Sequence, residues 1–368
     1  MNNYAVIMAG GVGTRFWPKG TLKVPKQFLK IANDSESLLQ QAYKRLEGIF
    51  KDERIFVVTN VIYKNEVKKQ LPRIPEENII CEPIGRNTAP CIGLACLFIG
   101  HFDPKANVLV VAADHLIEDL EEFHRVIGSG LAFVNGNGGI VTLGIHPTKP
   151  ETGYGYIQYD ADHFVDVEFN SKGKTVSEKI YRVKTFAEKP NLEVAKAFLE
   201  SGDFLWNSGM FIFRTDTMMQ EIAGLMPDLN ESLQRLSQKL FAPDFDKQLE
   251  EEYSKLKSIS IDYGVMEKSM NVFIIRSHFG WNDVGAWDEV YNIKEKDQDG
   301  NVKQGRTVTI DTKNCMIIND QKIVATIGVE DLLIINTDNG LLICKRGEAQ
   351  SVKDVVDYLR RKGLEQFL

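Results

Sequence analysis

A glycine-rich segment near the start of the chain carries the residue types best suited to bind phosphate groups. Its glycines are Gly10, Gly11 and Gly13. They follow an apolar run, residues 4–8, which predicts a first β-strand. Glycines let a backbone approach a ligand closely and direct its N–H groups at phosphate oxygens. Because Arg15 and Lys26 place two cations beside this turn, the segment predicts a loop that holds a polyphosphate rather than a plain strand-to-helix turn.

Two better-known glycine loops do not fit this segment. A Walker A loop ends in Gly-Lys-Ser/Thr, and no Lys follows Gly13. A dinucleotide-binding fingerprint needs a third Gly or Ala, where this chain has the bulky Phe16. The sequence therefore argues against a P-loop enzyme and against a nicotinamide-dependent dehydrogenase.

A carboxylate ends another apolar run. Asp114 follows residues 107–113, which read as a buried strand, and a charge in that place must be matched by a partner. Mg²⁺ binds to one or two carboxylates together with water and phosphate oxygens, so Asp114 is a candidate metal ligand. The alternative is that Asp114 caps the next helix. His115 fits a structural or supporting role better than ligation, because Mg²⁺ prefers oxygen.

These residues belong to a longer pattern. The stretch from Met8 to Leu29 is similar to the nucleotide-binding signature of the sugar-1-phosphate nucleotidyltransferases. Its Arg-Phe-Trp-Pro (15–18) and Pro-Lys-Gln-Phe (25–28) sequences resemble the mannose-1-phosphate guanylyltransferases in particular. Between them stands Lys-Gly-Thr-Leu (19–22), where this family has a Ser and charged residues. The similarity extends over nearly the whole chain, from Tyr4 to about Leu359.

The resemblance implies a reaction and the residues for it. It implies transfer of GMP from GTP to α-D-mannose 1-phosphate, with Arg15 and Lys26 as catalytic cations. It also implies that Asp114 and Asp283, which the sequence alone could not pair, bind Mg²⁺. Further nucleotide contacts are expected from the start of the glycine segment: Ala9, Gly10, Gly11, Gly13 and Thr14.

Residues 82–90 are the candidate base-reading segment, and the resemblance includes this Glu-Pro…Arg-Asn-Thr-Ala-Pro motif. The predicted contacts are Glu82, Pro83, Asn87 and Thr88. A guanine edge needs an acceptor for N1–H and N2–H₂ and a donor for O6. The candidate acceptors are Glu82 and backbone carbonyls, and the candidate donors are Asn87 or backbone N–H groups. Asn87 followed by Thr88 is also a good helix N-cap. Arg86 either contacts phosphate or balances the charge of Glu82.

Sugar contacts are expected from four segments that resemble the sugar half of the family's site. The predicted residues are Gly153, Tyr154, Glu188, Lys189, Asn207 and Asp262. Glycine permits close approach to a flat ligand, carboxylates accept hydrogen bonds from sugar hydroxyls, and a lysine suits the sugar phosphate. Each segment taken alone also fits ordinary turn chemistry.

Composition sets limits on function. The 368 residues carry a formal charge of −7, which argues against broad nucleic-acid binding but not against a nucleotide substrate. We expect no membrane span and no signal peptide, because no apolar run reaches about 18 residues and a strand begins almost at once. The five cysteines form no CxxC pair, which disfavours a zinc site and predicts reduced thiols in a cytoplasmic protein.

The pattern of elements predicts an α/β fold. Strand-like and helical runs alternate through the first third, which indicates a parallel sheet with helices on both faces. The fold class that we expect is Rossmann-like, with a mixed and mainly parallel sheet. A charge-rich helical region, residues 217–256, reads as a solvated lid or flank. After residue 301, short β-branched runs recur every eight to nine residues, and this predicts a small all-β unit, either a sandwich or coils of a β-helix.

The resemblance favours a nucleotidyltransferase fold followed by a left-handed β-helix-like unit that supports a homodimer. We therefore expect a catalytic domain over residues 1–295 and a C-terminal domain over residues 301–368, closed by a helix over 352–361. The chain is shorter than family members that carry a fused isomerase, so transferase activity alone is expected. Two alternatives remain: transfer of another nucleotide to another hexose 1-phosphate, and a catalytically silent regulatory paralogue.

Overall fold

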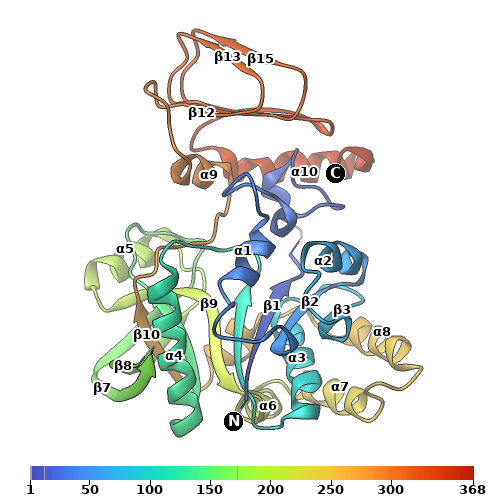
Figure 1. Ribbon diagram of the computed structural model, residues 1–368, viewed down its shortest axis with the longest axis vertical. Helices are drawn as coiled ribbons and strands as arrows, with labels where there is room; N and C mark the ends of the chain where they lie inside the picture. Colours follow the sequence, from blue (N-terminus) through green and yellow to red (C-terminus); the bar gives the residue numbers. More distant parts are fainter. Residues whose placement is uncertain (1, 12, 172) are drawn as a thin grey trace. The chain divides into compact units, whose positions relative to one another are not determined.

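A computed structural model describes residues 2–11, 13–171 and 173–368, and within it the chain forms two units (Figure 1). The first unit comprises residues 2–10, Ala42–Ala113 and Ile117–Trp281, and the second comprises Gly11–Gln41, Asp114–Leu116 and Asn282–Leu368. The chain passes between the units five times, and three of these passages fall within the short elements α1 (Leu38–Lys44), β5 (Leu116–Ile117) and β11 (Trp281–Asn282). Val12 of the glycine segment lies outside the described residues. The domain division between residues 295 and 301 stays a prediction, because these units are not continuous along the chain.

The first unit is built on a nine-stranded mixed sheet with the order β3-β2-β1-β4-β9-β6-β10-β8-β7. Its parallel half contains β3 (Ile79–Glu82), β2 (Ile55–Asn60), β1 (Asn3–Ala9) and β4 (Asn107–Ala112). The remaining strands are β9 (Phe204–Arg214), β6 (Ile140–Ile145), β10 (Val272–Ser277), β8 (Lys174–Ala187) and β7 (Tyr156–Ser171). β9 runs antiparallel to both β4 and β6, so the sheet is mixed, as the sequence predicts.

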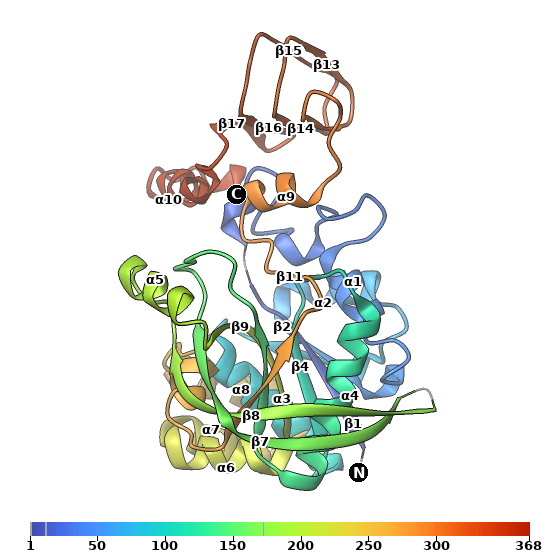
Figure 2. The same cartoon turned by 90° about the vertical axis from the view of Figure 1, so that its left-hand side faces the viewer.

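Helices cover both faces of this sheet (Figures 1 and 2). α4 (Leu120–Asn137) lies on one face, and α3 (Thr88–Phe102), α6 (Thr215–Leu225), α7 (Pro227–Ser237) and α8 (Phe245–Lys255) lie on the other. The shorter α2 (Lys64–Gln70) contacts β3, and α5 (Leu192–Ser201) contacts β9. Among the helices of the described residues, none is long and apolar enough to cross a bilayer.

The region over residues 217–256, predicted to be a lid or flank with solvated charges, forms three helices of the first unit. The helices α6, α7 and α8 each bury apolar side chains, including Ile222, Leu233 and Leu249, in the same core as α3. Most of their charged side chains are exposed or half-buried, whereas Glu252 of α8 is 4% exposed and pairs with Arg235 of α7. These helices are a structural layer of the first unit.

The second unit contains stacked coils of a β-helix. In parallel register lie β12 (Val302–Gln304), β14 (Met316–Asn319) and β16 (Leu332–Thr337), and separately β13 (Thr307–Ile310) and β15 (Val324–Ile327). β17 (Gly340–Lys345) closes the stack antiparallel to β16, as Figure 2 shows. The helices α9 (Trp287–Ile293) and α10 (Val352–Arg361) complete the unit. A β-helix rather than a sandwich is therefore the correct alternative for this region.

The segment after the glycines packs into the core of this second unit. Phe16 meets Trp287 edge to face with ring centroids 5.0 Å apart, and Trp287 Nε1 donates to the Trp17 carbonyl oxygen at 3.1 Å. Trp17 Nε1 in turn donates to the Phe367 carbonyl oxygen at 2.8 Å, near the end of the chain. Trp287 and the C-terminal Phe367 therefore help to hold the backbone next to Arg15.

Candidate active site

A cavity of about 260 Å³ in the second unit gathers the predicted phosphate and metal residues. Its lining comprises Gly13, Thr14, Arg15, Phe16, Lys26, Asp114, His115, Asp283 and Gly285. Both predicted catalytic cations and both predicted metal carboxylates are in that set. The two aspartates come from distant parts of the sequence, so their meeting in one cavity is a result that spacing alone does not give.

Lys26 is the central cation of this cavity. The residue begins a short 3₁₀ turn (Lys26–Phe28) and is 6% exposed. Its Nζ donates to Asp114 Oδ2 at 2.9 Å and to the Asp283 backbone carbonyl oxygen at 2.5 Å. The ammonium also lies 5.7 Å from the centroid of the Phe16 ring. Lys26 thus joins the two aspartate segments, one through a charge pair and one through the backbone.

The Lys26 contact decides the charge state of Asp114. Burial by itself would raise the pKa of Asp114, but the Lys26 ammonium, His115 and the hydrogen bond from Lys26 together lower that pKa below its ordinary value. Asp114 therefore carries a negative charge at neutral pH. The alternative role of this residue, capping the next helix, is not what the structure shows, because Asp119 is the N-cap of α4.

Gly13, which lines the cavity, and Val284, beside it, both have positive φ angles. Gly13 has φ +53°, and a Cβ there would stand 2.5 Å from the Lys26 Cβ, so a glycine is required. Val284, next to Asp283, has φ +45°, which is strained for a β-branched residue. Its N–H donates to Asn282 Oδ1 at 2.7 Å, which helps to hold this conformation.

Arg15 lines the same cavity with a largely exposed side chain. In the described part of the chain, no ion pair or side-chain hydrogen bond engages it. The other glycine-segment residues divide between the units: Ala9 and Gly10 belong to the first, and Gly11 and Thr14 to the second. The Ala9 carbonyl oxygen accepts from Thr59 Oγ1 at 2.9 Å, and that of Gly11 accepts from Gln27 Nε2 at 2.9 Å.

The first unit contains the predicted base-reading residues. Glu82 ends β3 and is 4% exposed, with its Oε1 3.2 Å from the Tyr253 hydroxyl. Its Oε2 lies 3.5 Å from the place of a Cβ at Gly10. Burial raises the pKa of Glu82 to about 7, although the Tyr253 hydrogen bond opposes this shift. Pro83, the next residue, is half-buried.

In this segment, hydrogen bonds to backbone groups engage the side chains of Asn87, Thr88 and Arg86. Asn87 has φ +68° and accepts from the Thr88 N–H at 2.8 Å, which is the N-cap geometry that the sequence left open. Thr88 Oγ1 accepts from the Ile261 N–H at 2.9 Å. Arg86 donates to the carbonyl oxygens of Tyr253 and Ser254 at 2.8 and 3.0 Å. These bonds show neither of the two roles considered for Arg86, which were balancing the charge of Glu82 and binding phosphate.

The predicted sugar residues Asn207, Asp262, Glu188 and Lys189 cluster in the first unit. Asn207 Nδ2 donates to Asp262 Oδ1 at 2.8 Å, and Lys189 Nζ donates to Glu188 Oε1 at 2.6 Å. Burial and the nearby Glu188 charge raise the pKa of Asp262 to about 6, against the opposing effect of the Asn207 hydrogen bond. Asp262 thus presents an acceptor of high proton affinity.

Residues outside the six predicted sugar contacts also take part in this cluster. A Cβ at Gly155 would stand 2.5 Å from Glu188 Oε2, so glycine is needed for the carboxylate to pack there. Glu267 Oε1 accepts from the Glu188 N–H at 3.1 Å. The Tyr154 ring, predicted to bind sugar, packs edge to face against Trp206 and Trp281 with centroids 5.2 and 5.1 Å away.

Gly153, also predicted to bind sugar, uses its N–H in a turn, donating to Glu151 Oε1 at 3.1 Å. The ordinary turn chemistry considered for these segments is therefore present at this glycine. Side-chain hydrogen bonds join four of the six predicted sugar residues in two pairs, Asn207 with Asp262 and Lys189 with Glu188. Gly153 and Tyr154 lie in the turn before β7. The aromatic contacts of Tyr154 had no signal in sequence spacing, because Trp206 and Trp281 come from distant segments.

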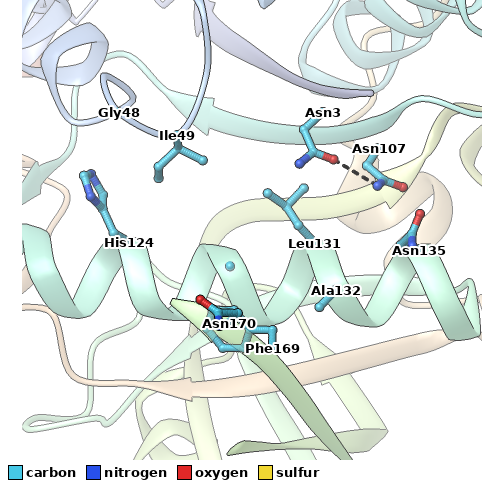
Figure 3. A pocket seen from close by; sticks show the side chains of 11 residues that line it. Asn3, Gly48, Ile49, Asn107, His124, Leu131, Ala132, Asn135, Phe169 and Asn170 are labelled. Atoms are coloured by element: carbon cyan, nitrogen blue, oxygen red, sulfur yellow. Dashed lines mark hydrogen bonds between the residues drawn. The ribbon is translucent and has the colours of Figure 1, made fainter. Parts of the chain in front are cut away.

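A larger hollow, of about 500 Å³, lies elsewhere in the first unit (Figure 3). Asn3, Asn107, His124 and Asn135 are among its lining residues, and Asn107 Nδ2 donates to Asn3 Oδ1 at 3.0 Å. None of the described residues that line it is a Lys, an Arg or a predicted site residue. A triphosphate needs cations, so volume alone does not identify the site.

Comparisons with known proteins agree with this geometry. The nucleotidyl transferase family model matches residues 4–300, and the MannoseP isomerase/GMP-like beta-helix domain matches residues 305–359. Proteins named mannose-1-phosphate guanylyltransferase are 38% identical in Escherichia coli and 37% identical in Klebsiella pneumoniae. Each alignment covers 98% of this chain, with 76% and 75% of the respective relative.

A solved structure extends the comparison to the fold. A crystal structure from Thermus thermophilus, described as a mannose-1-phosphate geranyltransferase, has a TM-score of 0.83 and 31% identity. The match covers 98% of this chain and 100% of that one. The extent of these matches, on both sequence and structure, shows that the chain belongs to the nucleotidyl transferase family.

Proposed function

We propose that this chain transfers GMP from GTP to α-D-mannose 1-phosphate, giving GDP-mannose and pyrophosphate. The observation that carries the proposal is the cavity that combines Arg15 and Lys26 with Asp114 and Asp283. Two cations with two carboxylates suit a triphosphate that arrives with a divalent metal. The choice of GTP and mannose 1-phosphate is supported by the names of the relatives and by the acceptors in the first unit.

The proposed reaction is a displacement at phosphorus. A non-bridging oxygen of the sugar phosphate forms a bond to the α-phosphorus of GTP, and the bond from that phosphorus to the α–β bridging oxygen breaks. The electron pair leaves with pyrophosphate. Arg15 and Lys26 stabilise the added negative charge, Arg15 with a fork of donors and Lys26 as a point charge. Catalysis of this kind is mainly positioning and charge stabilisation.

The donor set of the cavity fits Mg²⁺. Asp114 is ionised at neutral pH and lines the same cavity as Asp283, and hard carboxylate oxygens are what this ion prefers. When bound, Mg²⁺ would neutralise phosphate charge. Lys26 already pairs with Asp114, so this lysine holds the carboxylate in its charged form before any metal arrives.

The first unit supplies the proposed recognition groups. Glu82 accepts from the N–H groups of guanine, and the carboxylates of Glu188 and Asp262 accept from sugar hydroxyls. Lys189 offers a cation to the sugar phosphate. Asp262 is held by Asn207, so its free oxygen has a fixed direction.

We also propose a homodimer in the cytoplasm. Apolar side chains on the β-helix are exposed: Val308, Ile310, Ile327 and Ile343. A second copy of the chain would cover such a surface. The free thiols of the five cysteines suit a reducing compartment. Light scattering coupled to size exclusion tests the dimer, and a monomer at micromolar concentration would contradict it.

Pyrophosphate release from the purified protein tests the reaction. The assay combines mannose 1-phosphate and Mg²⁺ with GTP, ATP, UTP, CTP or dTTP in turn, and repeats GTP with glucose 1-phosphate. We expect release only when GTP and mannose 1-phosphate are both present. Release with another nucleotide or sugar would keep the reaction class and overturn the substrate assignment. A folded protein with no release would favour the regulatory paralogue.

A further inference from the structure

Tyr253 is a buried residue that no motif singled out, yet it contacts the base-reading segment. It lies on α8 and is 1% exposed. Its hydroxyl oxygen is 3.2 Å from Glu82 Oε1 and 3.2 Å from the Pro90 carbonyl oxygen. A hydroxyl has one proton, so it donates to only one of these two oxygens at a time.

The two protonation states of Glu82 use this hydroxyl differently. Protonated Glu82 donates to the Tyr253 oxygen, and Tyr253 donates to the Pro90 carbonyl oxygen, which satisfies all three groups without a charge. Ionised Glu82 needs donors, and Tyr253 then turns its proton toward Oε1. Tyr253 is therefore a donor that supports the anion whenever Glu82 gives up its proton.

The surroundings of Glu82 contain little else that could stabilise its charge. Facing it are Tyr253 from α8 and Cys91 from α3, and burial raises the pKa of the Cys91 thiol, which stays neutral. Gly10, which follows β1, also lies near Oε2. In the described part of the chain no cation forms an ion pair with Glu82, so the Tyr253 hydrogen bond is the main support of the anion.

Tyr253 is also fixed in place through its own backbone. Arg86 donates to the carbonyl oxygens of Tyr253 and Ser254, at the end of α8. Farther along, the Ile259 N–H donates to the Arg86 carbonyl oxygen, and the Ala89 N–H donates to that of Ile259. The segment after α8 is thus bonded repeatedly to the base-reading segment, which gives the Tyr253 hydroxyl a defined position.

We propose that Tyr253 is a positioning residue for base selection, because it stabilises the ionised Glu82 that a nucleobase with adjacent N–H donors requires. Guanine offers N1–H and N2–H₂, and only the anion accepts from both without donating. Binding of GTP then moves the Glu82 proton to solvent and turns the Tyr253 hydroxyl from Pro90 to Glu82. The inference rests on the proposed use of GTP and adds proton release to it.

Wild-type protein gives the first test. Titration calorimetry of GTP with saturating Mg²⁺, in pairs of buffers of different ionisation enthalpy, counts the protons released. Mg²⁺ keeps the free triphosphate ionised, so the released protons come from the protein. We expect release approaching one proton near pH 6 and little near pH 8.5. Release that stays at zero from pH 6 to 8.5 would overturn the proposal.

Tyr253→Phe gives the second test, with Tyr43→Phe as a matched control. Tyr43 is another buried tyrosine of the first unit, and its hydroxyl donates to Asp52 at 2.6 Å, outside the predicted site. Tyr253→Phe removes the hydrogen bond that supports ionised Glu82, so the pKa of Glu82 should rise. GTP binding should then weaken about three- to tenfold at pH 7, where a smaller fraction of Glu82 is ionised, but less than twofold at pH 9. The KM for the sugar phosphate should not change. Tyr43→Phe should leave both values as in the wild type.

The outcomes separate this inference from the proposed function. Equal weakening of GTP binding at pH 7 and pH 9 would show a structural role only and would overturn the positioning role. GTP-dependent pyrophosphate release with an unchanged pH profile in Tyr253→Phe would likewise reject the inference while keeping the function. Release that depends on another nucleotide would instead reject the function itself.

Discussion

The candidate-site carboxylates of the two units differ in the side chains that contact them and in their pKa values. In the second unit, Lys26 pairs with Asp114 and lowers its pKa. In the first unit, Glu82 has a tyrosine as its hydrogen-bond partner and a pKa of about 7, and Asp262 has Asn207 and a pKa of about 6. Glu82 and Asp262 thus titrate much closer to neutral pH than Asp114 does.

This difference corresponds to the ligands that each unit is proposed to bind. A triphosphate and its metal need fixed charges, and the ion pair provides them at neutral pH. A base edge and a sugar are neutral donors, and a carboxylate of high proton affinity is a strong acceptor for them once it is ionised. The comparison predicts that neutralising mutations have opposite effects on stability in the two units.

The largest effect is expected from the aspartates of the second unit. Asp114→Asn or Asp283→Asn should lower kcat by about 10³-fold, because each removes a charge that would hold the metal against the phosphates. Pyrophosphate release measures this loss, and circular dichroism checks the fold. Asp320→Asn is the control, since Asp320 pairs with Lys19 in the same unit and does not line the cavity. Full activity in either cavity variant would remove the metal assignment.

Arg15→Ala should lower kcat by about 10²-fold with little change in the KM for GTP. The reason is that Arg15 has no protein partner within the described residues and is available for charge that develops during transfer. Steady-state kinetics separate the two constants. Arg306→Ala, an exposed arginine of the same unit, should behave like the wild type. A change confined to KM would instead make Arg15 a residue of ground-state binding.

Much of the fold follows from local sequence patterns. The closing helix Val352–Arg361 has the predicted limits, and the regular β-branched runs after residue 301 form the strands of the β-helix, because each is a short amphipathic or apolar run between turn residues. The helix α4 was missed, since Gly128, Gly130 and Gly136 interrupt its pattern. A Cβ at Gly130 would stand 2.3 Å from Ile212 Cδ1, so tertiary packing explains a residue that disfavours helices.

The sequence motifs pointed to candidate site residues, but they did not indicate which of these residues contact one another. The residues of the glycine segment could be identified because closely spaced glycines followed by cations are suited to binding phosphate. The pairing of Lys26 with Asp114, and the contact of Tyr253 with Glu82, join segments far apart in the chain. Asn87 shows the opposite case, because the alternative of a helix cap was also read correctly from its type and place.

Lys26→Met should destabilise the second unit by about 2 kcal/mol at pH 7. It leaves the Asp114 carboxylate without its cation, and the partial exposure of Asp114 limits the cost through solvent screening. Asp114 has a lowered pKa, so the stability from this pair is present above its ordinary value of 3.8 and is lost as pH falls through the folded-state pKa. Urea unfolding of wild type and variant should therefore converge below about pH 4. A difference that persists undiminished at pH 3 would show that packing, not charge, explains the loss.

Glu82→Gln should do the reverse and stabilise the first unit by about 1 kcal/mol at pH 8. The folded pKa of Glu82, about 7, lies above its ordinary value of 4.5, so the ionised form costs stability. That cost is absent below pH 4.5, grows as pH rises toward 7 and is complete above it. The amide keeps the size of the side chain and a hydrogen bond to Tyr253 while removing the charge. Urea unfolding from pH 4.5 to 8.5 should show a gain that increases with pH, together with weaker GTP binding. A gain of the same size at every pH would mean that Glu82 is not the group that titrates, and the contrast between the units would then rest on Asp262 alone.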